Sequence, residues 1–161
     1  MAPKVAAVTF VVAAALALVG GAAAAQLTLT LGSAPSFGVN LDGTDQSVPF
    51  SFTMSVSGGG SAGWNITASA TAFAVGGHSL GFPTVTGVPN AACSGSHCVD
   101  PTNGTTYPVA LAASAVKIYS AAAATGQGTI PLTANLTLAV PGNAFAGAYT
   151  STLTLAIASG P

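Results

Sequence analysis

Apolar and polar residues alternate with a period of two along several stretches of the chain. Residues 48–56 carry Val, Phe, Phe, Met and Val at every second position, with Pro49 and small polar residues between them. The same alternation recurs over 130–140 and 149–157, and a shorter version covers 27–31. A period of two places apolar side chains on one face of a β-strand. We therefore expect these four stretches to form strands with one buried face each.

Weaker strand patterns fill the gaps between these stretches. The candidates are 36–41, 64–73, 84–88, 107–111 and 115–119. Glycine, proline and asparagine clusters separate them and predict turns. Short strands joined by regular turns are typical of an all-β fold, an antiparallel β-sandwich with immunoglobulin-like or related topology.

Two segments depart from this strand-and-turn pattern. The stretch 74–108 concentrates glycine, proline, both cysteines and both histidines. It is expected to be mostly connecting loop, with at most one short edge strand. Ser120 to Ala124 is expected to form a single helical turn with Ser120 as its N-cap, ended by the glycines of 125–128.

The N-terminus has the pattern of a secretory signal peptide. Lys4 supplies a positive charge, residues 5–19 are apolar apart from one threonine, and three alanines at 23–25 precede Gln26. The apolar run is shorter than the ~20 residues that span a bilayer, so a retained anchor is the weaker interpretation. We expect removal of residues 1–25, which leaves one domain over 26–161 with no stable membrane span.

The chain is almost uncharged, and this excludes whole classes of function. It holds 2 Lys+Arg and 3 Asp+Glu residues, which is 3% of its length, while 50% of its residues are apolar. Binding of nucleic acid depends on clustered basic residues, so it is excluded. Acid-base catalysis needs His, Asp, Glu, Lys and Cys side chains, which are few and scattered here. The composition therefore predicts a protein that is not an enzyme and needs no cofactor.

Cys93 and Cys98 lie close together in a chain that is expected to be exported, so a local disulfide is the expected state. Two other interpretations use the same residues. The first is a zinc site formed by Cys93, His97, Cys98 and Asp100, with His78 as a further ligand, although only one pair of cysteines is present. Cys98 with His97 and Asp100 would be a nucleophilic site, although a disulfide would consume the thiol. We expect no metal and no catalytic residue.

The segment Asp42 to Asp45 has the composition of a solvated turn. Carboxylates around a glycine also suit Ca²⁺, but an EF-hand needs a longer series of ligands ending in Glu, and the chain has no Glu. Solvent-exposed turn aspartates are therefore the preferred interpretation.

Two sequence motifs together resemble the WxL domain of bacterial surface proteins. The first is Gly63-Trp64-Asn65-Ile66-Thr67, which contains the only tryptophan. The second is the C-terminal stretch 148–161. It matches the family's closing pattern at the following residues: Tyr149, Leu153, Thr154, Ile157, Gly160 and Pro161. Leu155 stands where the family has its second tryptophan.

The resemblance implies export, display at the cell surface and non-covalent attachment to peptidoglycan. The motif residues would then belong either to the core or to a wall-binding face. They are Trp64, Ile66, Tyr149, Leu153, Leu155 and Ile157. The strand alternation favours the core for Trp64. The leading hypothesis is a secreted, non-enzymatic, cell-wall-associated binding or structural module. The alternative is a self-assembling coat or pilus-like subunit, because an uncharged surface lacks the edge lysines that discourage strand addition.

Overall fold

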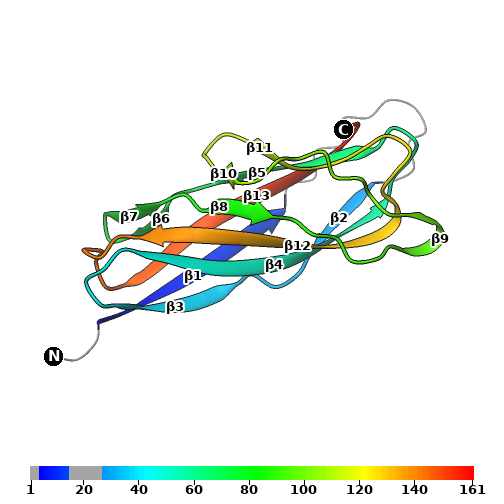
Figure 1. Cartoon of the computed structure of the whole chain (residues 1–161). Coiled ribbons are helices and arrows are strands. Elements are labelled where there is room, and N and C mark those ends of the chain that lie inside the picture. The colour runs from blue at the N-terminus through cyan, green and yellow to red at the C-terminus, as the bar shows by residue number, and fades with distance from the viewer. Residues whose placement is uncertain (1–3, 15–26) are drawn as a thin grey trace.

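The fold is an antiparallel β-sandwich, described by a computed structural model over residues 4–14 and 27–161 (Figure 1). This confirms the all-β class predicted from the alternation. No helix in these two ranges is long and apolar enough to cross a membrane. The helical turn expected at 120–124 does not form. The strand there extends to Ala121, and Thr125 N then donates to Ala122 O (3.1 Å) in a turn.

The first sheet contains seven strands. Its main path runs β11 (Val116–Ala121), β5 (Trp64–Ala70), β13 (Ala148–Ser159), β1 (Lys4–Ala14) and β3 (Ser36–Leu41). Two short strands extend it, because β6 (Phe73–Val75) pairs with β13 and with β7 (His78–Gly81).

The second sheet contains six strands. Its path runs β10 (Val109–Ala110), β8 (Thr84–Gly87), β12 (Gln127–Val140), β4 (Gln46–Gly58) and β2 (Thr28–Leu31), and β9 (Ser94–Val99) also pairs with β12. The pair β4 and β12 runs the length of the molecule, in register from Val140 opposite Gln46 to Gly128 opposite Gly58 (Figure 1).

The core lies between the two sheets and consists of the alternating apolar residues. On β12, the buried side chains are those at every second position, Ile130, Leu132, Ala134, Leu136 and Leu138, and the residues that alternate with them are less buried. Towards one end Phe37 stacks on Phe50 across the sheets (ring centroids 4.8 Å apart), and Phe73 meets both edge-on. Burial of one face of each sheet is the main favourable term in folding.

The stretch 74–108 is more regular than the sequence suggested. It was expected to be mostly loop with at most one short edge strand, and it contains β7, β8 and β9 together with the end of β6. These strands are short. β8, which coincides with the candidate 84–88, and β9 both pair with the distant strand β12, with Val85 opposite Leu136, whereas β7 pairs with its neighbour β6. Pairing across the sheet supplies the order that local alternation did not indicate.

The expected signal peptide falls partly on β1. The cleavage site at residues 23–25 lies outside the described residues, so removal of residues 1–25 stays a prediction. Residues 4–14 form β1, which lies between β13 and β3 (Figure 1). It pairs in parallel with β13, from Ala7 opposite Ala148 to Ala14 opposite Leu155. All other strand pairings in the described ranges are antiparallel.

Candidate functional site

Trp64, the residue on which the family resemblance depends, is completely buried at the start of β5. Its Nε1 donates a hydrogen bond to Gly126 O (2.7 Å), and its ring stacks on Tyr119 with centroids 5.3 Å apart. A sugar ring needs an exposed aromatic face, and Trp64 offers none. The structure therefore places Trp64 in the core.

The other motif residues lie beside it, in the ladder between β5 and β13. Ile157 is opposite Ile66, and Leu155 is opposite Ala68. These side chains are buried, as are those of Tyr149 and Leu153. The Tyr149 hydroxyl donates to Phe145 O (3.0 Å) and so ties the loop before β13 to that strand. The apolar residues of both motifs therefore form part of the core.

The end of the chain is fastened next to this motif. Gly160 N donates to Gly63 O (3.0 Å), and Asn65 Nδ2 donates to Gly160 O (2.7 Å). These bonds hold the C-terminus against the start of β5. The closing glycine of the motif, Gly160, therefore has a structural role in this chain.

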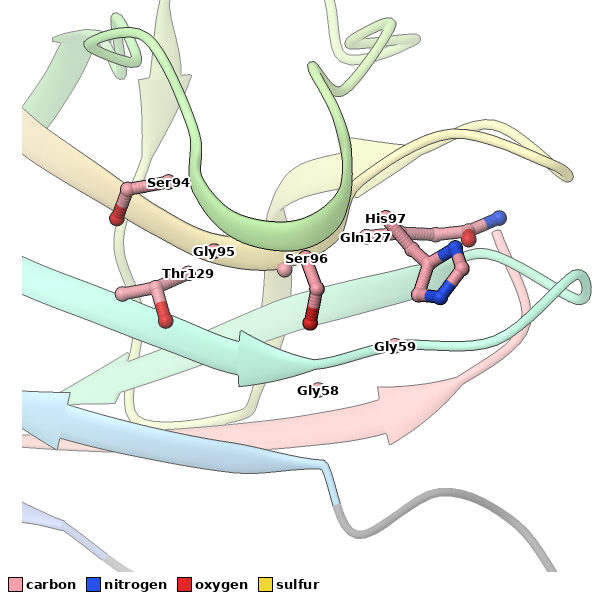
Figure 2. A pocket seen from close by; sticks show the side chains of 9 residues that line it. Gly58, Gly59, Ser94, Gly95, Ser96, His97, Gln127 and Thr129 are labelled. Atoms are coloured by element: carbon pink, nitrogen blue, oxygen red, sulfur yellow. The ribbon is translucent and has the colours of Figure 1, made fainter.

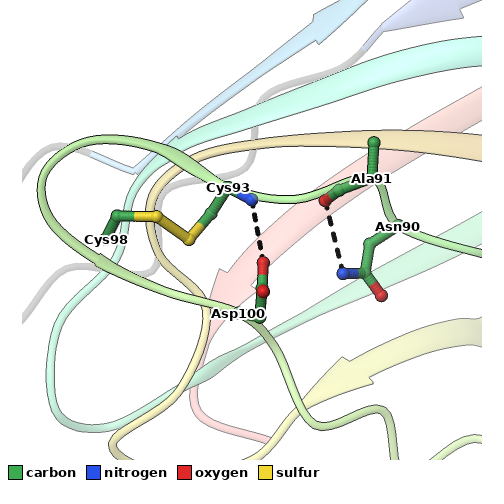
Figure 3. Close-up of a disulfide and its surroundings, with 5 residues drawn as sticks. All are labelled: Asn90, Ala91, Cys93, Cys98 and Asp100. Atoms are coloured by element: carbon green, nitrogen blue, oxygen red, sulfur yellow. Dashed lines mark hydrogen bonds between the residues drawn. A yellow bond between two sulfur atoms is a disulfide. The ribbon is translucent and has the colours of Figure 1, made fainter.

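The two cysteines form the disulfide that the sequence predicted (Figure 3). Asp100 accepts a hydrogen bond from Cys93 N (2.8 Å) and so closes the base of the loop. The disulfide leaves no thiol for the proposed nucleophile and no thiolate for zinc. Within residues 4–14 and 27–161, no group of three or more His, Cys, Asp or Glu side chains is placed to hold a metal ion.

We expect replacement of both cysteines by serine to lower the free energy of unfolding by about 2 kcal/mol at most, because the loop that they close is short. Urea unfolding of Cys93→Ser/Cys98→Ser beside the wild type measures this loss, and thiol titration of native protein is expected to find no free thiol. Stoichiometric bound zinc in purified protein, or a rapidly reacting thiol, would contradict the prediction.

An open pocket of about 350 Å³ lies beside the disulfide loop, between β9 and the ends of β4 and β12 (Figure 2). Ser94, Ser96, His97, Gln127 and Thr129 line it together with glycines. His97 adopts a φ of 60°, which is uncommon for a residue other than glycine. The lining of the pocket offers hydroxyl, amide and imidazole groups but no Phe, Tyr or Trp side chain.

The Asp42 to Asp45 turn is held by its own hydrogen bonds. Asp42 Oδ1 accepts bonds from Thr44 N (2.9 Å), Thr44 Oγ1 (2.7 Å) and Gln46 Nε2 (3.1 Å). The bonds from Thr44, and then that from Gln46, lower the pKa of Asp42. Asp45 Oδ1 accepts a bond from Gly142 N (2.8 Å). Both carboxylates therefore have structural partners within the protein.

Two tyrosines, Tyr119 of β11 and Tyr107 before β10, differ in their hydrogen bonding. The Tyr107 hydroxyl donates to Ile118 O (2.6 Å) and accepts a bond from Asn103 Nδ2 (3.1 Å). Burial raises the pKa of Tyr107, and the bond from Asn103 partly offsets that rise. The Tyr119 hydroxyl is buried without a hydrogen-bond partner in the described residues, and burial also raises its pKa strongly. Both side chains stay uncharged at neutral pH.

An exposed aromatic pair lies near the β6–β7 hairpin, and no sequence pattern indicated it. Phe145 is 56% exposed, and its ring stacks on the His78 ring with centroids 4.5 Å apart and planes 4° from parallel. His78 follows a Gly-Gly turn and Phe145 lies in the loop between β12 and β13. The two are far apart in sequence, so only the fold brings them together.

Comparison with known proteins adds no further assignment. No protein-family model matches this chain, and no curated protein matches it.

Proposed function

We propose that this protein is a secreted, non-catalytic module of the cell surface that associates with the cell wall. The observation that carries the proposal is the Cys93–Cys98 disulfide, which lies in an exposed loop. Disulfides persist in oxidising compartments outside the cytosol, and an exposed one is open to reductants. The disulfide thus agrees with export, which the N-terminal pattern predicts independently.

The geometry favours a structural role over a catalytic one. The cysteines are oxidised, and the aspartates at 42, 45 and 100 accept structural hydrogen bonds. The tryptophan motif is buried between the sheets. For contact with wall glycan, the stacked pair of Phe145 and His78 offers an exposed aromatic face, the kind of surface on which sugar rings pack.

Fractionation of cells that produce the native protein tests this proposal. We expect the protein in the wall fraction, with a mass that corresponds to a start at Gln26 or within a residue or two of it. Purified wall should sediment the exported protein, and Phe145→Ala should reduce the bound fraction several-fold because it removes an exposed ring.

The matched control is Phe82→Ala, which removes another partly exposed phenylalanine, 42% exposed. It should sediment like the wild type. Recovery of the chain in the cytosol with Met1 intact would overturn export. Equal sedimentation of Phe145→Ala and wild type would overturn this mode of wall contact.

Self-assembly is the second candidate, and one specific observation favours it. β1, which lies between β13 and β3 in the first sheet, belongs to the segment expected to be removed on export. An exported chain would then lack a strand in the middle of that sheet.

A further inference from the structure

The strand β1 connects two strands that do not otherwise pair. β13 pairs with β1 over Ala148–Leu155, and β3 pairs with β1 over Ser36–Leu41. Within the described residues β3 pairs with no other strand. Removal of residues 1–25 would therefore leave two facing strand edges with unpaired N–H and C=O groups, and such edges bind added strands.

β3 is held in place by contacts that do not involve β1. Phe37 of β3 stacks on Phe50 of β4. At the other end of β3, Gln46 Nε2 donates to Asn40 O (2.8 Å), and the Asp42 turn follows directly.

The corner between β3 and β4 is also fastened to the loop that leads into β13. Asp45 Oδ1 accepts the bond from Gly142 N, and Gly142 packs so closely on Gly43 that a Cβ there would lie 2.6 Å from Gly43 C. These contacts oppose a sideways movement of β3 onto β13. The gap therefore stays one strand wide, about 9–10 Å between the two edges.

We infer that, in the processed chain, the gap between β13 and β3 binds the N-terminal strand of a second copy, residues 27–31. This inference rests on the export step of the proposed function, because that step removes β1. The bound strand runs as β1 does, parallel to β13 and antiparallel to β3. Each copy then donates one strand and accepts another, which is a head-to-tail exchange that builds open chains.

Residues 27–31 fit this role by position and by pattern. After cleavage at residue 25 they form the free end of the chain. In their own sheet β2 is an edge strand with four residue pairs, all to β4. The gap offers eight positions along β13 and six along β3. Exchange thus increases the number of paired residues.

The side chains of residues 27–31 match the two faces of the sheet. They alternate leucine and threonine, and Tyr149, Ser151 and Leu153 of β13 point into the core. With Leu29 placed opposite Ser151, each leucine of the donated strand faces the core and each threonine faces solvent. No charged residue occurs in β13, β3 or residues 27–31. The gap therefore lacks the edge charges that normally prevent strand addition.

The test uses the full chain with a specific protease site inserted between residues 21 and 22. Before cleavage we expect a monomer by light scattering after size exclusion. After cleavage we expect displacement of the fragment that holds β1 and at least a doubling of mass. A tenfold excess of a synthetic peptide of residues 4–14 should return the cleaved protein to monomers.

Cysteine cross-linking identifies the donated strand. Thr30→Cys combined with Thr152→Cys places two exposed thiols on adjacent strands of different copies, and cleavage should produce disulfide-linked multimers. Thr30→Cys with Ser47→Cys is the matched control, since Ser47 is exposed on the other sheet. The control should remain unlinked.

Three results would overturn the inference. Two of them begin with a cleaved chain that stays monomeric: slow amide exchange over 148–155 would show that β3 has closed onto β13, and fast exchange would show an empty gap. Retention of the cleaved β1 fragment through size exclusion, without multimers, shows that the chain keeps its own strand. The cleavage assay does not depend on cellular location, so multimers formed by a protein that is found in the cytosol would overturn only the proposed function.

Discussion

Trp64→Ala is expected to lower the free energy of unfolding by about 3–5 kcal/mol. The substitution removes a large, fully buried side chain and leaves a cavity between the sheets. It also removes the bond from Trp64 Nε1 to Gly126 O and the stacking on Tyr119. Urea unfolding followed by circular dichroism measures the loss, because the variant has no tryptophan fluorescence. In the wild type, that fluorescence should be blue-shifted and resistant to quenchers.

Phe145→Ala is the control for this measurement. Its ring is exposed, so the same kind of truncation should change stability by less than about 0.5 kcal/mol. The two substitutions also separate folding from wall contact. A Trp64→Ala variant that melts like the wild type but no longer sediments with wall would show that Trp64 contacts the wall.

The long strands could be predicted because their burial is one-sided. In β4, β12 and β13 a single face meets the core, so every second residue is apolar and the sequence carries the period directly. The burial of Trp64 followed from the same alternation, since it shares a face with Ile66 and Ala68. Local pattern was sufficient wherever a strand had one buried face.

The short strands β7 and β9 could not be predicted because no apolar alternation marks them, whereas β3 and β8 coincide with the candidates 36–41 and 84–88. All residues of β9 are exposed, so no apolar period marks it, although it overlaps the disulfide loop and pairs with β12. The contact between His78 and Phe145 depends on where the fold places the start of β7 and the loop between β12 and β13. Sequence positions alone do not indicate which loops meet at one end of a sandwich.

The N-terminal segment shows how one pattern can have two physical meanings. An apolar run of this length suits export, and it also suits a strand inside a sheet. The sequence favoured export, and the fold places residues 4–14 between β13 and β3. Both interpretations hold if residues 4–14 complete the first sheet before processing, and if their removal then leaves a gap between β13 and β3 that can bind another strand.

The tight turn at Gly126 accounts for a second large expected effect. Gly126 has a φ of +68°, in the left-handed region that favours glycine. A Cβ at this position would lie 2.6 Å from Trp64 Nε1 and 3.0 Å from the Ala121 Cβ. Gly126→Ala therefore combines backbone strain with a clash against a buried ring. We expect a loss of about 2–5 kcal/mol in urea unfolding.

Two other glycines separate these causes. Gly76 has a φ of +51° with nothing within 4 Å of a new Cβ, so Gly76→Ala should show only the strain, about 1–2 kcal/mol. Gly60 has open space and no left-handed φ, so Gly60→Ala should change stability by less than about 0.5 kcal/mol. If Gly126→Ala costs no more than Gly76→Ala, the ring of Trp64 moves freely to accept a methyl group. The close packing of Trp64 against Gly126 would then be unnecessary for stability. The core around Trp64 would in that case tolerate an added methyl group, which a fully buried and closely packed ring should exclude.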